Sequence, residues 1–287
     1  MLLTAGRVSG LALASGEVIP ASRVVLASGS YGSPAILLRS GVGPKAHLAG
    51  LGIACASDLD GVGRNLSDHP LMGVGFAMPS PISADRPGYQ VVLTLRSSLA
   101  DDPGPDLHIF PSFSAPDDSG KNLFTLYVGV MKPRARGRLM LDSTDPATPP
   151  RIHTAMLEDD RDFARIIEGV GEARRIARTA PLSGLALEEL MPGPGTAADL
   201  DAAVRAQSGT YFHPVGTCRM GPAGDRGAVV DSAGRVHGID GLHVADASIM
   251  PTIPRANTNL TALMIAERIA ELLLTETRAI ATRQFSE

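Results

Sequence analysis

The chain has 287 residues, of which 44% are hydrophobic and 20% charged, with a formal net charge of −4 and a pI near 6.0. This composition is typical of a globular protein with a large core and one or two domains, and the acidic balance argues against a nucleic-acid partner. The two cysteines, Cys55 and Cys218, lie far apart, which argues against a disulfide framework or a zinc site and favours a reducing compartment. The sequence shows neither signal-peptide features at Met1 nor the ~20 apolar residues that span a bilayer, so we expect a cytoplasmic protein without a transmembrane segment.

Residues 7–27 predict a β-hairpin that leads into a short buried strand. Apolar residues alternate over 7–13, a turn follows at 15–17, and residues 24–27 form a short continuous apolar run. The glycine-rich residues 28–34 then break the chain. A helix is expected over 35–40, with Ser33 as its N-cap and Pro34 as its first residue. Strand, glycine-rich turn and helix N-terminus together can bind an anion, and a plain tight turn is the alternative.

Residues 71–142 predict an antiparallel sheet, because short β-like runs are separated there by clusters of Pro, Gly, Asp and Ser. The five runs are 71–78, 90–96, 106–111, 123–131 and 137–141. One face of such a sheet could cover a pocket.

A helix is expected over about residues 157–179, with apolar residues at helical spacing. Its other face is basic and predicted to be solvated; the arginines are Arg161, Arg165, Arg174, Arg175 and Arg178. A shorter helix is expected over 199–207. No linker is apparent, so the chain should form one domain from 1–70 and 213–287 and a second from 71–212.

The residues that could carry chemistry gather between 211 and 274. His213 precedes a proline, which favours extended backbone, and an ordinary pKa of about 6.5 lets a histidine accept a proton at neutral pH. Asp246 ends a predicted strand at 242–245 and could bind hydroxyl groups of a cofactor or cap the following turn. Asn257 and Asn259 precede an apolar helix, which they could simply cap. The helix N-terminus could also stabilise an anion such as a reduced flavin.

Several segments together resemble the glucose–methanol–choline (GMC) flavoprotein oxidoreductases, most closely their choline- and alcohol-dehydrogenase branch. Residues 29–43, GSYGSPAILLRSGVG, resemble the second GMC signature, and residues 61–69, GVGRNLSDH, resemble the family's VGxNLxDH segment. Residues 213–221, HPVGTCRMG, and 246–251, DASIMP, resemble its C-terminal signature. The resemblance implies an α/β (α+β) class, with a partial FAD-binding GMC fold in 1–70 and 213–287 and an antiparallel-sheet substrate-binding domain in 71–212.

The resemblance also implies a reaction, the oxidation of a small-molecule alcohol to an aldehyde or ketone by hydride transfer to N5 of FAD. His213 would be the base and Asn257 would hydrogen-bond the substrate oxygen. The residues implied in FAD contact are Asp246, Ala247, Asn259, Leu260, Thr261, Ala27 and Gly29.

GMC proteins begin with a strand–GxGxxG–helix unit that binds the ADP half of FAD, and this sequence contains neither that unit nor the first GMC signature. We therefore expect apolar surface beside residues 24–27 to lie uncovered, and tight FAD binding to need a separate N-terminal FAD-binding chain. The alternative is a non-catalytic remnant that interacts with a flavoprotein. A serine hydrolase is disfavoured because no G-x-S-x-G occurs.

Overall fold

The computed structural model describes residues 1–78, 91–114, 122–185 and 187–284. The chain divides into two compact units. Unit 1 comprises Met1–Ser67, Arg136–Thr154 and Pro214–Glu287, and unit 2 comprises Asp68–Ala135 and Ala155–His213. Residues 136–154 group with the chain ends, which no local sequence pattern indicated. The assignment of FAD binding and substrate binding to two domains stays a prediction.

Unit 2 is built on an antiparallel sheet with strand order β13-β7-β10-β9-β8, and β14 also pairs with β7. The strands are β7 (Pro70–Met78), β8 (Leu93–Leu95), β9 (Leu107–Ser114), β10 (Asn122–Val130), β13 (Glu188–Met191) and β14 (Gly209–Thr210). The expected antiparallel sheet is therefore confirmed for four of the five runs, although Gln90 lies outside the described residues. The fifth run was placed wrongly, since β11 (Arg138–Met140) pairs with β12 (Arg151–His153) in unit 1.

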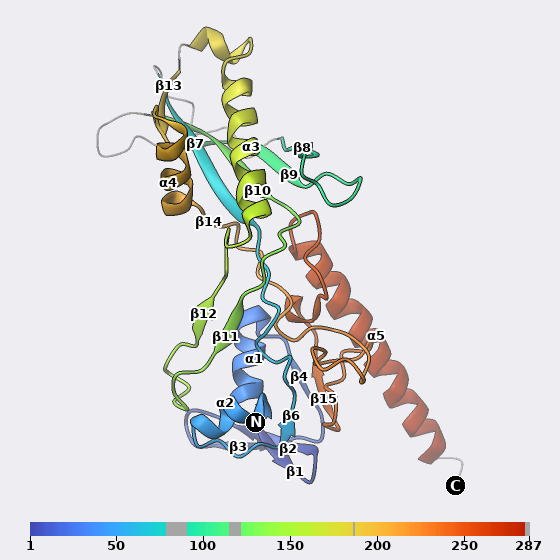
Figure 1. Ribbon diagram of the computed structural model, residues 1–287. Helices are drawn as coiled ribbons and strands as arrows, with labels where there is room; N and C mark the ends of the chain where they lie inside the picture. The colour runs from blue at the N-terminus through green and yellow to red at the C-terminus, as the bar shows by residue number, and fades with distance from the viewer. Residues whose placement is uncertain (79–90, 115–121, 186, 285–287) are drawn as a thin grey trace. The chain divides into compact units, whose positions relative to one another are not determined.

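Helix α3 (Asp160–Ala177) packs against β10, β7 and β9 of this sheet (Figure 1). Its N-cap is Asp159, whose carboxylate accepts hydrogen bonds from the backbone N–H groups of Arg161 and Asp162. A Cβ at Gly169 would lie 2.4 Å from Cγ1 of Val128, so a glycine there lets the helix approach β10 closely. The apolar side of α3 closes a core with the sheet, as its spacing predicts.

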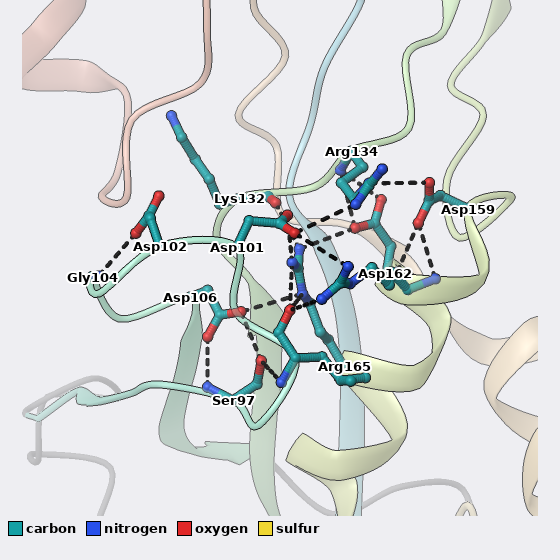
Figure 2. Close-up of polar contacts among 12 residues, drawn as sticks. Ser97, Asp101, Asp102, Gly104, Asp106, Lys132, Arg134, Asp159, Asp162 and Arg165 are labelled. Atoms are coloured by element: carbon teal, nitrogen blue, oxygen red, sulfur yellow. Dashed lines mark hydrogen bonds and ion pairs between the residues drawn. The ribbon is translucent and has the colours of Figure 1, made fainter.

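The expected solvated basic face of α3 is wrong for Arg165, which is only 1% exposed. Its guanidinium pairs with Asp101 at 2.6 Å, Asp106 at 3.3 Å and Asp162 at 3.4 Å (Figure 2). It also donates to the carbonyl of Leu99 at 2.9 Å. A buried charge needs such partners, because an isolated charge in the protein interior is very costly. The network therefore ties the chain segment before β9 to the first turns of α3.

Two further helices complete unit 2. The helix α4 (Ala197–Gln207) begins with a capping box, in which Thr196 and Asp199 exchange side-chain and backbone hydrogen bonds. The guanidinium of Arg205 lies 3.7 Å from the ring centroid of Phe163, a cation–π contact that joins α4 to α3. A short 3₁₀ helix, η1, spans Leu182–Leu185.

Unit 1 contains the predicted hairpin, formed by β2 (Arg7–Ala12) and β3 (Val18–Pro20), with β1 (Leu2–Thr4) added on the other side of β2. The buried strand that follows, β4 (Val24–Leu26), pairs in parallel with β15 (Leu242–Val244). The remaining elements are β5 (Val42–Gly43), α2 (Lys45–Gly50), β6 (Ser57–Asp58) and the 3₁₀ helix η2 (Ala247–Ile249). A single apolar core joins these segments from both ends of the chain.

Helix α1 (Gly29–Arg39) starts earlier than predicted, so Ser33 is not its N-cap and Pro34 lies in its interior. A proline in the second turn removes the N–H that would bond the carbonyl four residues earlier, that of Ser30. The hydroxyl of Thr217 donates to this carbonyl instead, at 2.7 Å. The Ser33 hydroxyl is used elsewhere, because it donates to Asp246. Tertiary partners thus make a helix possible where the local sequence predicts a turn.

Helix α5 (Asn259–Gln284) packs Ile265 and Ile269 against the core of unit 1. Other apolar side chains on it are exposed, namely Leu260 (77%), Leu263, Met264 and Leu274. No helix within the described residues is long and apolar enough to cross a membrane.

Candidate active site

The predicted base His213 lies in unit 2, at the end of a short turn that follows β14. Because β14 pairs antiparallel with the start of β7, the residues just beyond β14 lie opposite Asp68 and His69, which precede β7. The Asp68 carboxylate accepts a hydrogen bond from the backbone N–H of His213 at 2.9 Å and another from the hydroxyl of Thr210. The backbone N–H of Tyr211 donates to the carbonyl of His69 at 3.0 Å. The pair Asp68–His69 therefore holds the whole turn.

The turn has an unusual backbone at Phe212. Its φ of +63° is in the left-handed region, which residues other than glycine rarely adopt. The backbone N–H of Phe212 donates to the hydroxyl of Thr210 at 2.7 Å, which closes the turn. The Phe212 side chain is 81% exposed, while the neighbouring His213 is buried. The tight turn thus directs two adjacent side chains into different environments.

The imidazole of His213 contacts a second imidazole. Nδ1 of His213 lies 3.0 Å from Nδ1 of His69, and the two ring planes meet at 84°. Both residues are buried: His69 has no exposed surface, and His213 is 8% exposed. At this distance the two nitrogens share a hydrogen bond, in which one ring donates and the other accepts.

A row of aromatic rings extends from His213 across β9 and β10. The ring of Tyr211 lies 4.5 Å from that of His213 and stacks on Phe110 at 5.2 Å. Phe110 in turn stacks on Tyr127 at 5.4 Å. A Cβ at Gly129 would lie 3.2 Å from the Tyr211 ring, so the glycine makes room for it. The face of the sheet beside His213 is therefore aromatic.

The electrostatics around His213 favour its neutral form. Burial lowers the pKa of His213 below its ordinary value, and repulsion from His108 lowers it further. Burial raises the pKa of Asp68, although the donors from Thr210, His213 and His69 act in the opposite direction. A neutral imidazole is the form that can accept a proton, so His213 meets the first requirement for a general base at neutral pH.

A second cluster of predicted residues lies in unit 1, at one edge of the parallel pair β4 and β15. The carboxyl ends of parallel strands lie at the same edge of a sheet, and ligands of open α/β sheets bind there. Asp246 accepts at Oδ2 from the backbone N–H of Gly29 at 3.0 Å and from the Ser33 hydroxyl at 2.5 Å, and at Oδ1 from the N–H of Ser248 at 2.8 Å. Asp246 thus caps η2 and ties it to α1, and a contact of this carboxylate with a cofactor stays a prediction.

The other predicted cofactor residues surround this edge. Ala27 follows β4, Gly29 is the first residue of α1, and Ala247 is the first residue of η2, which contacts both α1 and α5. Asn259, Leu260 and Thr261 form the first turn of α5. Helix N-termini favour anionic groups, so this edge fits the pyrophosphate or the reduced ring of FAD. In the described part of the chain, no group of His, Cys, Asp and Glu side chains is arranged to hold a metal ion.

Asn257 is exposed and lies two residues before α5, in unit 1. Its partnership with His213, which belongs to unit 2, stays a prediction. Sequence reasoning gave no role to Asp68, His69, Thr210 or Tyr211, which carry the polar contacts of the His213 turn. The only signal was that Asp68 and His69 end the segment GVGRNLSDH.

Sequence profiles of the GMC oxidoreductase family match residues 4–71 and 133–266 of this chain. The chain is 38% identical to 5-(hydroxymethyl)furfural oxidase of Methylovorus sp. (strain MP688), over 96% of its own length and 56% of that protein. It is 34% identical to oxygen-dependent choline dehydrogenase 1 of Chromohalobacter salexigens, over 86% of its own length and 50% of that protein. It therefore spans about half the length of these curated relatives.

Solved structures show the same fold. Pyridoxine 4-oxidase from Mesorbium loti matches with a TM-score of 0.84 and 31% identity, over 94% of this chain and 55% of that chain. A formate oxidase variant from Aspergillus oryzae matches with a TM-score of 0.83 and 23% identity, over 93% of this chain and 57% of that one.

The fold and the matched segments are those of a family of flavoprotein oxidoreductases, whose cofactor is FAD. The chain belongs to the GMC oxidoreductase family and is similar to its choline-dehydrogenase-like members.

Proposed function

We propose that this chain takes part in the FAD-dependent oxidation of an alcohol to an aldehyde or ketone, with His213 as the base. The observation that supports this role is the buried His213 imidazole, favoured in its neutral form and held by Asp68 and His69. A general base of this kind typically contributes about 100- to 10,000-fold to the rate.

In this proposal His213 accepts the proton of the substrate hydroxyl, and the amide of Asn257 donates a hydrogen bond to the developing alkoxide. Removing the proton makes the carbinol C–H bond a better hydride donor. FAD, when bound, supplies the hydride acceptor at N5. The residues that would hold it are Ala27, Gly29, Asp246, Ala247, Asn259, Leu260 and Thr261.

The alternative is that the chain has no catalytic role and serves as an interaction partner of a flavoprotein. The exposed apolar side chains of α5, and Val25 on β4, which is exposed as well, favour additional protein packed against unit 1. Both functions need that protein, which could be further sequence of the same polypeptide or a separate N-terminal FAD-binding chain.

The test is a flavin titration of the purified chain, alone and with a separately produced FAD-binding segment from a relative. Bound flavin is followed by its visible absorbance. 5-(Hydroxymethyl)furfural, choline and pyridoxine are then added without oxygen, because the relatives' names point to these compounds. Bleaching by any of them supports the proposal, provided that His213→Gln abolishes bleaching while flavin stays bound.

The matched control is His153→Gln, because His153 is an exposed histidine on β12. Full bleaching by His213→Gln would refute the proposed base. Flavin binding by the assembled protein without bleaching by a wider panel of alcohols would favour the non-catalytic alternative.

A further inference from the structure

We propose that His69 is a positioning residue for His213, which it holds in the tautomer that carries hydrogen on Nδ1, so that the substrate proton is accepted at Nε2. The inference rests on the proposed function, because the choice between the two tautomers is argued from the needs of a base, but the tautomer itself can be observed without turnover.

The first step concerns the hydrogen between the two rings. A neutral imidazole has one N–H and one acceptor nitrogen, so a contact of 3.0 Å between two Nδ1 atoms allows two arrangements. If His69 donated, Nδ1 of His213 would be the acceptor and its hydrogen would lie on Nε2, which could then accept no proton. If His213 donates, its Nε2 carries the lone pair.

The second step concerns the protonated state. When His213 takes up a proton it becomes a donor at both nitrogens, and its Nδ1–H can still donate to Nδ1 of His69. That hydrogen bond becomes charge-assisted and therefore stronger. With the opposite arrangement, protonation would turn two N–H groups toward each other. Only the arrangement in which His213 donates serves both states of a base without a movement of either ring.

The third step is that the backbone fixes the separation of the two rings. Asp68 binds the N–H of His213, while the carbonyl of the next residue, His69, binds the N–H of Tyr211. The Tyr211 ring contacts both imidazoles, with centroids 6.1 Å from His69 and 4.5 Å from His213. Two backbone hydrogen bonds and a shared aromatic neighbour therefore set the Nδ1–Nδ1 contact.

The direct test is a two-bond ¹H–¹⁵N correlation spectrum of the full chain labelled with ¹⁵N-histidine, recorded above the ordinary histidine pKa. Ring nitrogen shifts show which nitrogen carries hydrogen. We expect His213 to be protonated at Nδ1 and His69 at Nε2. Signals are assigned with His213→Gln and, separately, His69→Asn. The opposite pair of tautomers, or a His213 tautomer that is the same in the wild type and in His69→Phe, which removes the acceptor, would overturn the proposal.

A second measurement uses the FAD-loaded assembly described above. His69→Phe removes the acceptor and should lower kcat by roughly 10- to 100-fold, since a hydrogen bond to a charged group is lost. KM should change little. His69→Asn offers a carbonyl oxygen as acceptor and should recover part of the loss. Equal kcat values for the wild type, His69→Phe and His69→Asn would overturn the positioning role. Turnover by His213→Gln would instead refute the proposed base, and the tautomers observed by NMR would be unaffected.

Discussion

The hydroxyl of Thr217 donates a hydrogen bond, 2.7 Å long, to the carbonyl of Ser30 inside helix α1. Pro34 leaves that carbonyl without its intrahelical donor, so a residue from the HPVGTCRMG segment completes a helix that begins near the other end of the chain. Thr217 is fully buried. The segment that follows His213 is therefore also a structural part of unit 1.

Replacing Thr217 with Val should destabilise unit 1 by about 1–3 kcal/mol, because the buried Ser30 carbonyl loses its donor. Pro34→Ala restores the helical N–H and should rescue much of that loss. Chemical denaturation of wild type, both single variants and the double variant gives the coupling free energy. Strictly additive effects would show that Thr217 does not replace the missing N–H.

Replacing Arg165 with Met should lower the free energy of unfolding of unit 2 by about 3–5 kcal/mol, because Asp106 and Asp162 would be left buried without their cation. The control on the same helix is Arg175→Met. Arg175 is exposed and its guanidinium pairs with Glu172, three residues earlier on the same helix, so its loss should hardly change stability. Similar denaturation midpoints for the two variants would contradict the network's role.

The lowered pKa of His213 has a consequence for stability at acidic pH. Below the ordinary histidine pKa of about 6.5 the unfolded chain takes up a proton that the folded state resists, so stability is lost as pH falls from that value through the lowered pKa. His213→Gln lacks this contribution. Urea denaturation of both proteins across this range should therefore show a steeper acid loss in the wild type. Parallel stability curves would mean that the pKa of His213 is not lowered.

The two cysteines should differ strongly in reactivity. Cys55 is exposed, while burial raises the pKa of the fully buried Cys218 thiol far above its ordinary value. The thiolate is the reactive form, so an aromatic disulfide reagent should modify one thiol in the native protein and the second only in denaturant. Cys55→Ser should remove the native reaction. Rapid modification of that variant without denaturant would show that Cys218 is accessible.

Patterns that depend on neighbouring residues predicted much of the fold. The hairpin of β2 and β3 and the helix α3 follow from hydrophobic alternation and helical spacing. The start of α1 could not be predicted, because it depends on Thr217 and Asp246, which are distant in the sequence. The burial of Arg165 was missed for the same reason, since two of its carboxylate partners, Asp101 and Asp106, become its neighbours only when the segment before β9 packs against α3.

The candidate site, too, could be predicted only in part from the sequence. The resemblance pointed to His213, but the residues that hold it could be found only from the pairing of β14 with β7, and β14 has two residues. A strand so short has no periodicity to recognise. For Asp246, the structure shows the cap of η2 that the sequence left open as an alternative to cofactor binding.

The pairing of β4 with β15 also governs how the protein folds during synthesis. Val24 leaves the ribosome early, but it cannot pair with Leu242 until most of the chain has been synthesised. Loop closure over such a separation is slow, so unit 1 should be the late-folding part, with its apolar strand exposed to chaperones or aggregation meanwhile. Unit 2, whose segments all precede β15, can complete its sheet first. A chain that stops before β15 should therefore retain a folded sheet domain joined to an unfolded N-terminal segment.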